Sequence, residues 1–154
     1  MGEHTEHHTE HHTGHDAQAS ALENKIQEVV ERVKAHVSET SGGAPFEEPS
    51  IGLILGSGLG FIADHFEDAT VIPYTELPHF PRSTIVGHEG SLVIGRFEGK
   101  LCVCMKGRVH YYEGYDMRTL AFPIYVMRAL GIKTLLVTNA AGGVNPTFKV
   151  GDLM

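Results

Sequence analysis

A glycine-rich stretch in the first half of the chain has the residue types of an anion-binding turn. Residues 50–55 form a short apolar run that predicts a buried strand, and the run ends in Gly56-Ser57-Gly58-Leu59-Gly60. Glycines let the backbone turn tightly and aim several N–H groups at one point, and the start of a following helix adds its positive dipole end. Ser57 supplies a hydroxyl donor. An ordinary strand-to-helix turn is the alternative that this stretch leaves open.

A second set of polar residues, Arg108, His110 and Tyr112, follows the strand expected at residues 100–106. In an extended chain these alternate residues point to one side, which places a permanent cation, a titratable donor and a phenol on one face. The Arg guanidinium has a fork geometry suited to phosphate, and a His ring can donate to an oxyanion. The alternative is a solvated strand end with Tyr112 packed on the core.

Taken together, the two stretches favour a site for free phosphate. The glycine-rich turn lacks the Lys-Ser/Thr pair of a nucleoside triphosphate loop. It also lacks the dinucleotide fingerprint, because Phe61 stands where the third glycine is needed. A cluster of backbone N–H groups with one Arg and one His therefore fits phosphate better than a nucleotide tail.

Helix and strand patterns that could position these residues alternate along the chain. Ser20 and Glu23 form a capping box that predicts a helix from Ser20, and residues 41–45 end it. Residues 117–130 carry apolar residues at helical spacing, with Gly131 as the stop.

Strands are predicted on either side of the second helix. They are residues 70–73 at an edge because of Pro73, residues 91–97 and 100–106 joined by a tight turn at Glu98-Gly99, and residues 133–138 covered on both faces. This alternation predicts an α/β fold with a mixed, largely parallel sheet flanked by helices. Ligands in such sheets bind beyond the carboxyl ends of the strands, where these turns would gather.

Composition limits the class of protein. The 154 residues are 42% apolar and 20% charged, as in one soluble globular domain, and no stretch approaches the ~18 apolar residues of a membrane span. Residues 1–50 carry the whole net charge of −7, so the rest gives no electrostatic case for nucleic acid. Cys102 and Cys104 suit core packing better than a disulfide framework or a metal, which favours a reducing cytosol.

The N-terminus is rich in histidine. Residues 1–16 repeat a Glu-His-His-Thr pattern with little to bury, so we expect a disordered tail over residues 1–19 and one domain over residues 20–154. Histidine runs can chelate zinc or nickel loosely, but no rigid scaffold fixes these ligands, and we predict no functional metal site.

Five ordered motifs resemble those of the trimeric purine nucleoside phosphorylases, over roughly residues 20–154. They are Gly56-Ser57-Gly58-Leu59-Gly60, Phe80-Pro81-Arg82-Ser83-Thr84, Gly87-His88-Glu89-Gly90, Gly107-Arg108-Val109-His110 with Tyr112-Glu113-Gly114-Tyr115, and Thr138-Asn139-Ala140-Ala141-Gly142-Gly143. A sister family that cleaves methylthioadenosine is similar, but typically carries Thr where Ser57 stands.

The resemblance implies a reaction of purine salvage. Inorganic phosphate attacks C1′ of a purine ribo- or deoxyribonucleoside and gives the free base and (deoxy)ribose 1-phosphate. The oxocarbenium-like sugar is stabilised and then captured by the bound phosphate dianion. Phosphate is a co-substrate, and the resemblance implies no cofactor and no metal. It also implies a homotrimer in the cytoplasm, with no nucleic acid or membrane partner.

The resemblance also assigns residues to roles. Phosphate would be held by Ser57, His88, Arg108, His110 and the backbone of Ala140. The nucleoside would lie against Tyr112, Asn139, Ala140, Ala141 and Gly142, and the catalytic residues would be His110, Tyr112 and Asn139. For His88 and His110, a role as hydrogen-bonded loop residues remains the alternative.

Family members run to nearly twice this length, and their purine-recognising residues have no counterpart within residues 1–154. The preference between 6-oxo and 6-amino purines is therefore left open. We expect a truncated domain, whose activity by itself is in question. A non-catalytic fragment that keeps a phosphate site, or a methylthioadenosine phosphorylase relative, is the alternative to a purine nucleoside phosphorylase.

Overall fold

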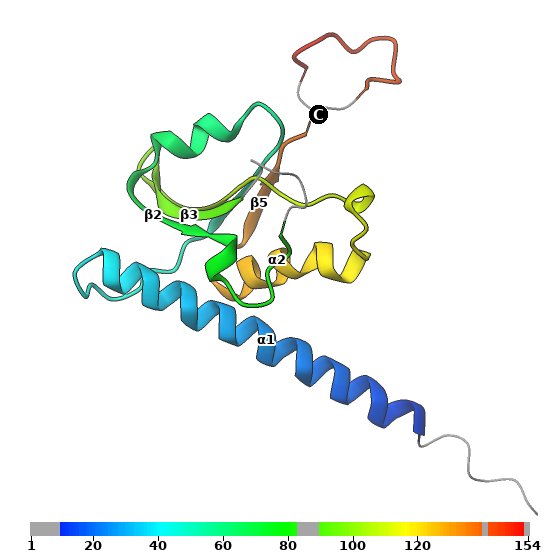
Figure 1. The fold of residues 1–154 in the computed structure, drawn as a ribbon. Coiled ribbons are helices and arrows are strands. Elements are labelled where there is room, and N and C mark those ends of the chain that lie inside the picture. Colours follow the sequence, from blue (N-terminus) through cyan, green and yellow to red (C-terminus); the bar gives the residue numbers. More distant parts are fainter. Residues whose placement is uncertain (1–9, 83–89, 140–141, 153–154) are drawn as a thin grey trace, which may run out of the picture.

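The protein is described by a computed structural model over residues 10–82, 90–139 and 142–152 (Figure 1). The two helices are α1 (Glu10–Thr40) and α2 (Met117–Ala129). The strands are β1 (Ile51–Leu55), β2 (Glu67–Pro73), β3 (Ser91–Phe97), β4 (Lys100–Lys106) and β5 (Thr134–Val137). Three short 3₁₀ segments connect them: η1 (Gly60–His65), η2 (Tyr74–Glu76) and η3 (Tyr111–Glu113).

The strands form one mixed sheet in the order β2-β3-β4-β1-β5. β1 pairs in parallel with β4 on one side and with β5 on the other, whereas β2–β3 and β3–β4 are antiparallel. The β3–β4 hairpin turns at Glu98 and Gly99, which both have positive φ, as in a type I′ turn. The predicted α/β class, mixed sheet, hairpin and edge position of β2 are confirmed.

The two faces of the sheet are covered differently. Figure 1 shows α1 and α2 on one side and η1 on the other. Alternation along β4 serves both faces: Val103 and Met105 face the helices, whereas Cys102 and Cys104 face η1. Both cysteines are buried and free, as predicted for core packing. Burial raises the pKa of the Cys104 thiol to about 12.

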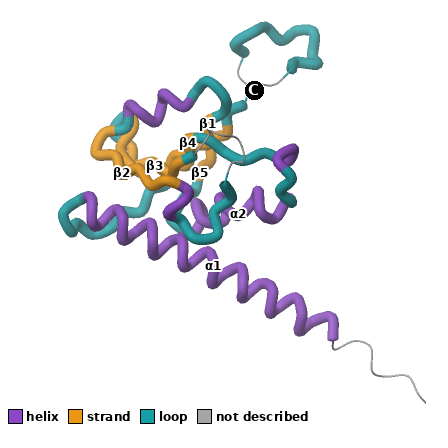
Figure 2. Tube along the Cα trace, viewed as in Figure 1, coloured by secondary structure: helices purple, strands orange, loops and turns teal. Residues whose placement is uncertain are grey.

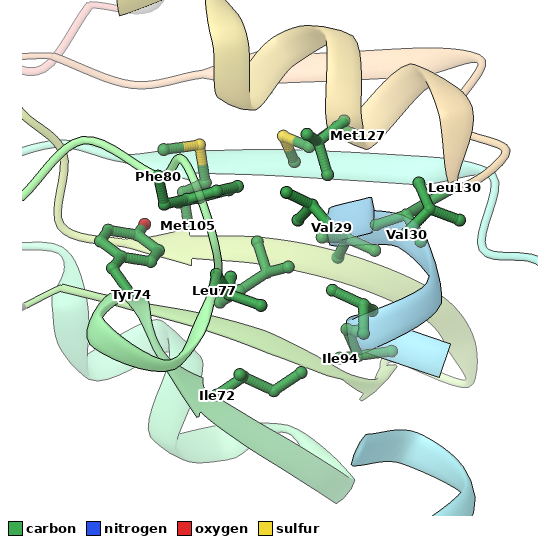
Figure 3. Close-up of a cluster of buried hydrophobic side chains, with 14 of the residues drawn as sticks. Val29, Val30, Ile72, Tyr74, Leu77, Phe80, Ile94, Met105, Met127 and Leu130 are labelled. Atoms are coloured by element: carbon green, nitrogen blue, oxygen red, sulfur yellow. The ribbon is translucent and has the colours of Figure 1, made fainter. Parts of the chain in front are cut away.

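The helix-side core joins α1, α2 and the strands (Figure 3). Helix α2 packs closely on β1 because Gly52 has no side chain; a Cβ there would lie 2.9 Å from the Met127 Cε. The labelled side chains come from α1 (Val29, Val30), α2 and the residue that follows it (Met127, Leu130), the strands (Ile72, Ile94, Met105) and the segment after β2 (Tyr74, Leu77, Phe80).

The N-terminal helix begins earlier than predicted. It starts at Glu10, so Ser20 lies inside it and is not an N-cap, and residues 10–19 are helical where a disordered tail was expected. A capping box is a local signal, and helical residues before it override that signal. Residues 1–9 lie outside the described residues. None of the described helices has the length and apolar character that crossing a membrane requires.

Strand β5 differs from the prediction of a strand covered on both faces. It lies at the end of the sheet and pairs with β1 along one edge. Its apolar side chains are exposed, Leu136 to 52% and Val137 to 57%. An apolar run predicts what a strand could bury, but burial also needs neighbours, and those that the structure describes do not cover β5. After β5, residues 142–152 form a loop (Figure 2).

Candidate active site

The candidate site lies where three strands end. β4, β1 and β5 run parallel side by side, so their carboxyl ends meet at one edge of the sheet. β1 leads into the glycine-rich turn at Gly56, β4 leads into Gly107 and Arg108, and β5 leads into Thr138 and Asn139. The topology therefore brings together three of the stretches that the sequence singled out.

The glycine-rich stretch forms a tight turn. The Leu59 N–H donates to the Gly56 carbonyl at 3.1 Å, and Gly58 has a φ of +83°, in the region that favours glycine. Ser57 is exposed on this turn. The chain then enters η1, a 3₁₀ segment of six residues rather than an α-helix. This short segment offers little of the helix dipole that the sequence suggested.

Thr138 joins this turn to the end of β5. The Gly56 N–H donates to Thr138 Oγ1 at 2.9 Å, and the Thr138 hydroxyl donates to the Ile54 carbonyl at 3.1 Å. The approach is close: a Cβ on Gly56 would lie 2.6 Å from the Thr138 carbonyl oxygen and 3.0 Å from the Asn139 Cα. Because its N–H is used in this way, Gly56 holds the turn in place rather than facing an anion.

Arg108 reaches the same residue from the other side of β1. Its Nη1 donates to the Thr138 carbonyl at 2.9 Å, and this contact is partly buried. A guanidinium carries several N–H donors in a planar fork, so one bond to a carbonyl orients it without using up its capacity for an anion. Arg108 also borders a small cavity of ≈ 70 Å³ whose lining includes Ile54, Met105 and Tyr74.

Tyr74 fixes the backbone that carries Arg108. Its hydroxyl donates to the Gly107 carbonyl at 2.8 Å, and its own N–H donates to the Gly90 carbonyl at 3.0 Å. Burial raises the pKa of the Tyr74 phenol, so the hydroxyl keeps its proton and stays a donor. Gly90 is pressed against the Tyr74 ring, since a Cβ there would lie 2.2 Å from Cε2.

His110 and Tyr112 form a stacked pair, with ring centroids 4.8 Å apart and planes inclined by 12°. The side chain of Glu113, only 2% exposed, holds the segment, because its Oε1 accepts from the His110 backbone N–H at 2.8 Å and lies 3.2 Å from His110 Nδ1. β4 ends at Lys106, and residues 111–113 form η3, so simple strand alternation does not extend to Tyr112.

The remaining predicted site residues divide into two groups. Asn139 is exposed beside the Gly56 turn, and Gly142 is exposed in the loop that follows. His88, Ala140 and Ala141 lie outside the described residues. Gly90, two residues after His88, packs beside Gly107: a Cβ on Gly107 would lie 3.3 Å from the Gly90 Cα.

Sequence reasoning missed three residues that organise the site: Thr138, Tyr74 and Glu113. Thr138 stood within a quoted motif without a role, and Tyr74 gave no signal because its partner is 33 residues away. Glu113 was detectable, since a carboxylate three residues after His110 has capping-box spacing. Within the described ranges, no cluster of three or more His, Cys, Asp or Glu side chains could hold a metal ion.

The larger hollows of the molecule lie elsewhere. One of ≈ 560 Å³ lies between the end of α1 and strands β2 and β3, and its lining includes Phe46 and the ion-paired Glu47 and Arg96. The strand-end edge is thus distinguished by its chemistry: the Arg108 guanidinium and the exposed groups of Ser57 and Asn139 lie at or beside one turn, and the His110–Tyr112 stack follows Arg108 along the chain.

The chain was compared with known proteins. A model of the phosphorylase superfamily matches residues 50–154. Purine nucleoside phosphorylase 1 of Geobacillus stearothermophilus is 59% identical over 106 residues, which are 69% of this chain and 39% of the relative. The purine nucleoside phosphorylase of Mus musculus is 51% identical over 106 residues, 69% of this chain and 37% of the relative. The chain thus spans about two fifths of these relatives' length.

Solved structures agree with these relatives. A purine nucleoside phosphorylase in complex with ribose-1-phosphate superposes with a TM-score of 0.73 at 46% identity, over 85% of this chain and 45% of that chain. The Schistosoma mansoni enzyme in complex with inosine gives 0.72 at 43% identity, over 84% and 42%. The match over more than half of this chain and the shared fold confirm the family resemblance, and the chain belongs to the phosphorylase superfamily.

Proposed function

We propose that this chain carries the phosphate-binding part of a purine nucleoside phosphorylase. The reaction is the reversible phosphorolysis of purine ribo- and deoxyribonucleosides to the free base and (deoxy)ribose 1-phosphate. The observation that carries the proposal is the link between Arg108 and the Gly56 turn through Thr138. The relatives named purine nucleoside phosphorylase and the related structure with ribose-1-phosphate support it.

In this proposal the phosphate lies over the turn. The Ser57 hydroxyl and the Arg108 guanidinium donate to it, and His110, His88 and the Ala140 N–H complete its shell. The nucleoside lies against Tyr112, Asn139, Ala140, Ala141 and Gly142. The buried Glu113 supports this arrangement because it holds the backbone and ring of His110 next to Tyr112.

The chemistry follows from charge. As the purine departs, the sugar becomes oxocarbenium-like, and a phosphate dianion held beneath C1′ stabilises it and then captures it. Arg108 and the backbone donors place the dianion and do not transfer protons. His110 helps to hold the phosphate, and Tyr112 and Asn139 position the sugar, so the rate depends mainly on positioning and electrostatics.

The test is a coupled assay that follows hypoxanthine release from inosine, with and without inorganic phosphate. Cleavage that requires phosphate supports the proposal, and equal cleavage without phosphate contradicts it. Calorimetric titration with phosphate gives the second readout. Arg108→Ala removes a charge-assisted contact worth ~1.5–3 kcal/mol, so the dissociation constant should rise roughly ten- to a hundredfold. The matched control is Arg128→Ala, because Arg128 is exposed and lies in the last turn of α2.

A second candidate is a phosphate-binding subunit without catalysis. The exposed apolar side chains of β5 favour it. Phosphate binding by the chain without inosine cleavage would support this candidate over an independent enzyme.

The finer assignments are proposals too. A homotrimer is tested by sedimentation, and a cytoplasmic location by imaging of the tagged protein. Ser57 in place of the sister family's Thr favours purine nucleosides over methylthioadenosine. Faster cleavage of methylthioadenosine than of inosine would reverse that assignment.

A further inference from the structure

Thr138 contacts the ends of all three parallel strands. Its backbone N–H donates to the Ile54 carbonyl at 2.9 Å and thereby continues the pairing of β5 with β1. Its hydroxyl accepts from the Gly56 N–H, just after β1. Its carbonyl accepts from Arg108, just after β4. The groups expected to hold phosphate therefore come from elements that meet at this residue.

The hydroxyl of Thr138 is used as both acceptor and donor. Oγ1 accepts from the Gly56 N–H at 2.9 Å and donates to the Ile54 carbonyl at 3.1 Å. Two bonds of opposite sense fix the rotation of the side chain and the orientation of the Gly56 peptide. Since Ser57 is the next residue, the orientation of that peptide sets the position of the Ser57 backbone and of the hydroxyl that it carries.

The packing around Gly56 leaves little freedom to compensate. The space that a Cβ on Gly56 would fill is occupied by the backbone of Thr138 and Asn139, at 2.6 and 3.0 Å. If the Thr138 hydroxyl is removed, the Gly56 turn loses the hydrogen bond that sets its distance to Thr138. The Thr138 carbonyl also holds Arg108, so a shift of Thr138 moves the guanidinium too. The turn and the guanidinium are therefore adjusted together.

We infer that Thr138 is a positioning residue for phosphate: its hydroxyl and carbonyl set the Gly56 turn and the Arg108 guanidinium at the separation that one phosphate needs. This role rests on the proposed phosphate site. It requires no contact between Thr138 and the ligand. Thr138 acts through Gly56 and Arg108, both of which donate a hydrogen bond to it.

The test is calorimetric titration of inorganic phosphate into four variants of the full chain. Thr138→Val keeps the shape and removes the hydroxyl. The phosphate dissociation constant should rise about three- to tenfold, the value of the hydrogen bond from the Gly56 N–H, since the Thr138 N–H still donates to the Ile54 carbonyl. Thr138→Ser keeps the hydroxyl and should remain within about twofold of the parent chain. Thr134→Val makes the matched change at the exposed amino end of the same strand and should leave binding unchanged.

The fourth variant, Thr138→Ala, keeps the inference testable if Thr138→Val does not fold. If Thr138→Val does not fold, the serine and alanine variants still differ by the hydroxyl alone, and alanine should bind phosphate more weakly. A purely structural role would lower the melting temperature of the variants and leave the phosphate dissociation constant unchanged, and that result overturns the inference. Absence of phosphate binding by the parent chain would instead overturn the proposed function.

Discussion

Replacing Gly56 with alanine tests how tightly the ends of β1 and β5 are packed. The new methyl group would lie 2.6 Å from the Thr138 carbonyl oxygen, 3.0 Å from the Asn139 Cα and 3.1 Å from the Thr138 carbonyl carbon. All three are backbone atoms, so no side-chain rotation relieves the overlap. The strand ends must separate by several tenths of an ångström, which strains the Gly56–Thr138 hydrogen bond.

Overpacking of this kind costs about 1–3 kcal/mol. At this chain length, that corresponds to a fall in melting temperature of roughly 2–12 °C. The phosphate dissociation constant should rise as well, because the displaced turn carries Ser57. Thermal unfolding followed by circular dichroism, together with phosphate titration, measures both effects.

The matched control is Gly60→Ala, four residues later. A Cβ on Gly60 would meet only the Lys106 side chain, at 3.8 and 3.9 Å, which is ordinary contact. Its expected change in stability is within about 0.5 kcal/mol. If Gly56→Ala and Gly60→Ala have the same melting temperature, the close approach of the strand ends is not a constraint and the reasoning is refuted.

Two further substitutions each remove one side-chain hydrogen bond and should lower the melting temperature. Tyr74→Phe leaves the Gly107 carbonyl without its donor and should cost about 1–3 kcal/mol, whereas Tyr125→Phe, on the exposed part of α2, should leave the melting temperature unchanged. Asp116 caps α2: the Thr119 N–H donates to its Oδ1 at 2.7 Å, and this bond lowers the pKa of the carboxyl. Because the folded-state pKa lies below the unfolded one, the stabilisation is complete above the unfolded pKa and is lost as the pH falls through the folded value. Asp116→Ala should therefore melt earlier than the parent at pH 7, and the difference should shrink below about pH 4; a constant difference would show that the charge plays no part.

The meeting of these stretches at one edge of the sheet was predictable, because apolar strand runs ending in glycine-rich turns indicate a parallel arrangement whose carboxyl ends lie together. The hydrogen bonds that organise the edge were not. Thr138 lies 82 residues from Gly56 and 30 from Arg108, and a threonine after an apolar strand has no pattern that names such partners. Only the assembled sheet brings them together.

Single sequence signals also failed where neighbouring residues decide the outcome. Ser20 and Glu23 have capping-box spacing, yet α1 continues through them to Glu10, since a capping side chain has no effect once helix precedes it. Likewise, the alternation of Arg108, His110 and Tyr112 assumed an extended chain, but Glu113 accepts from the His110 N–H and closes a 3₁₀ turn. The His110–Tyr112 stack arises from that turn and not from strand geometry.

The exposure of β5 leads to a last prediction, in which one chemical change is compared at two strands. Val137 in β5 is 57% exposed, whereas Val103 in β4 is 0% exposed. Replacing valine by threonine keeps the shape and adds a hydroxyl. In β4 that hydroxyl is buried in the helix-side core, with an expected cost of about 1–3 kcal/mol.

In β5 the same hydroxyl meets water, so Val137→Thr should change the free energy of unfolding by less than about 0.5 kcal/mol. It should also reduce the fluorescence of a dye that binds apolar surface, because Leu135, Leu136 and Val137 form the exposed apolar part of this strand. Chemical denaturation and dye titration of the two variants measure these effects. Equal destabilisation by the two substitutions would mean that β5 is covered in solution, as the sequence had predicted. That result would point to a partner packed against β5, because only a partner that buries Val137 makes its hydroxyl as costly as one in a core strand.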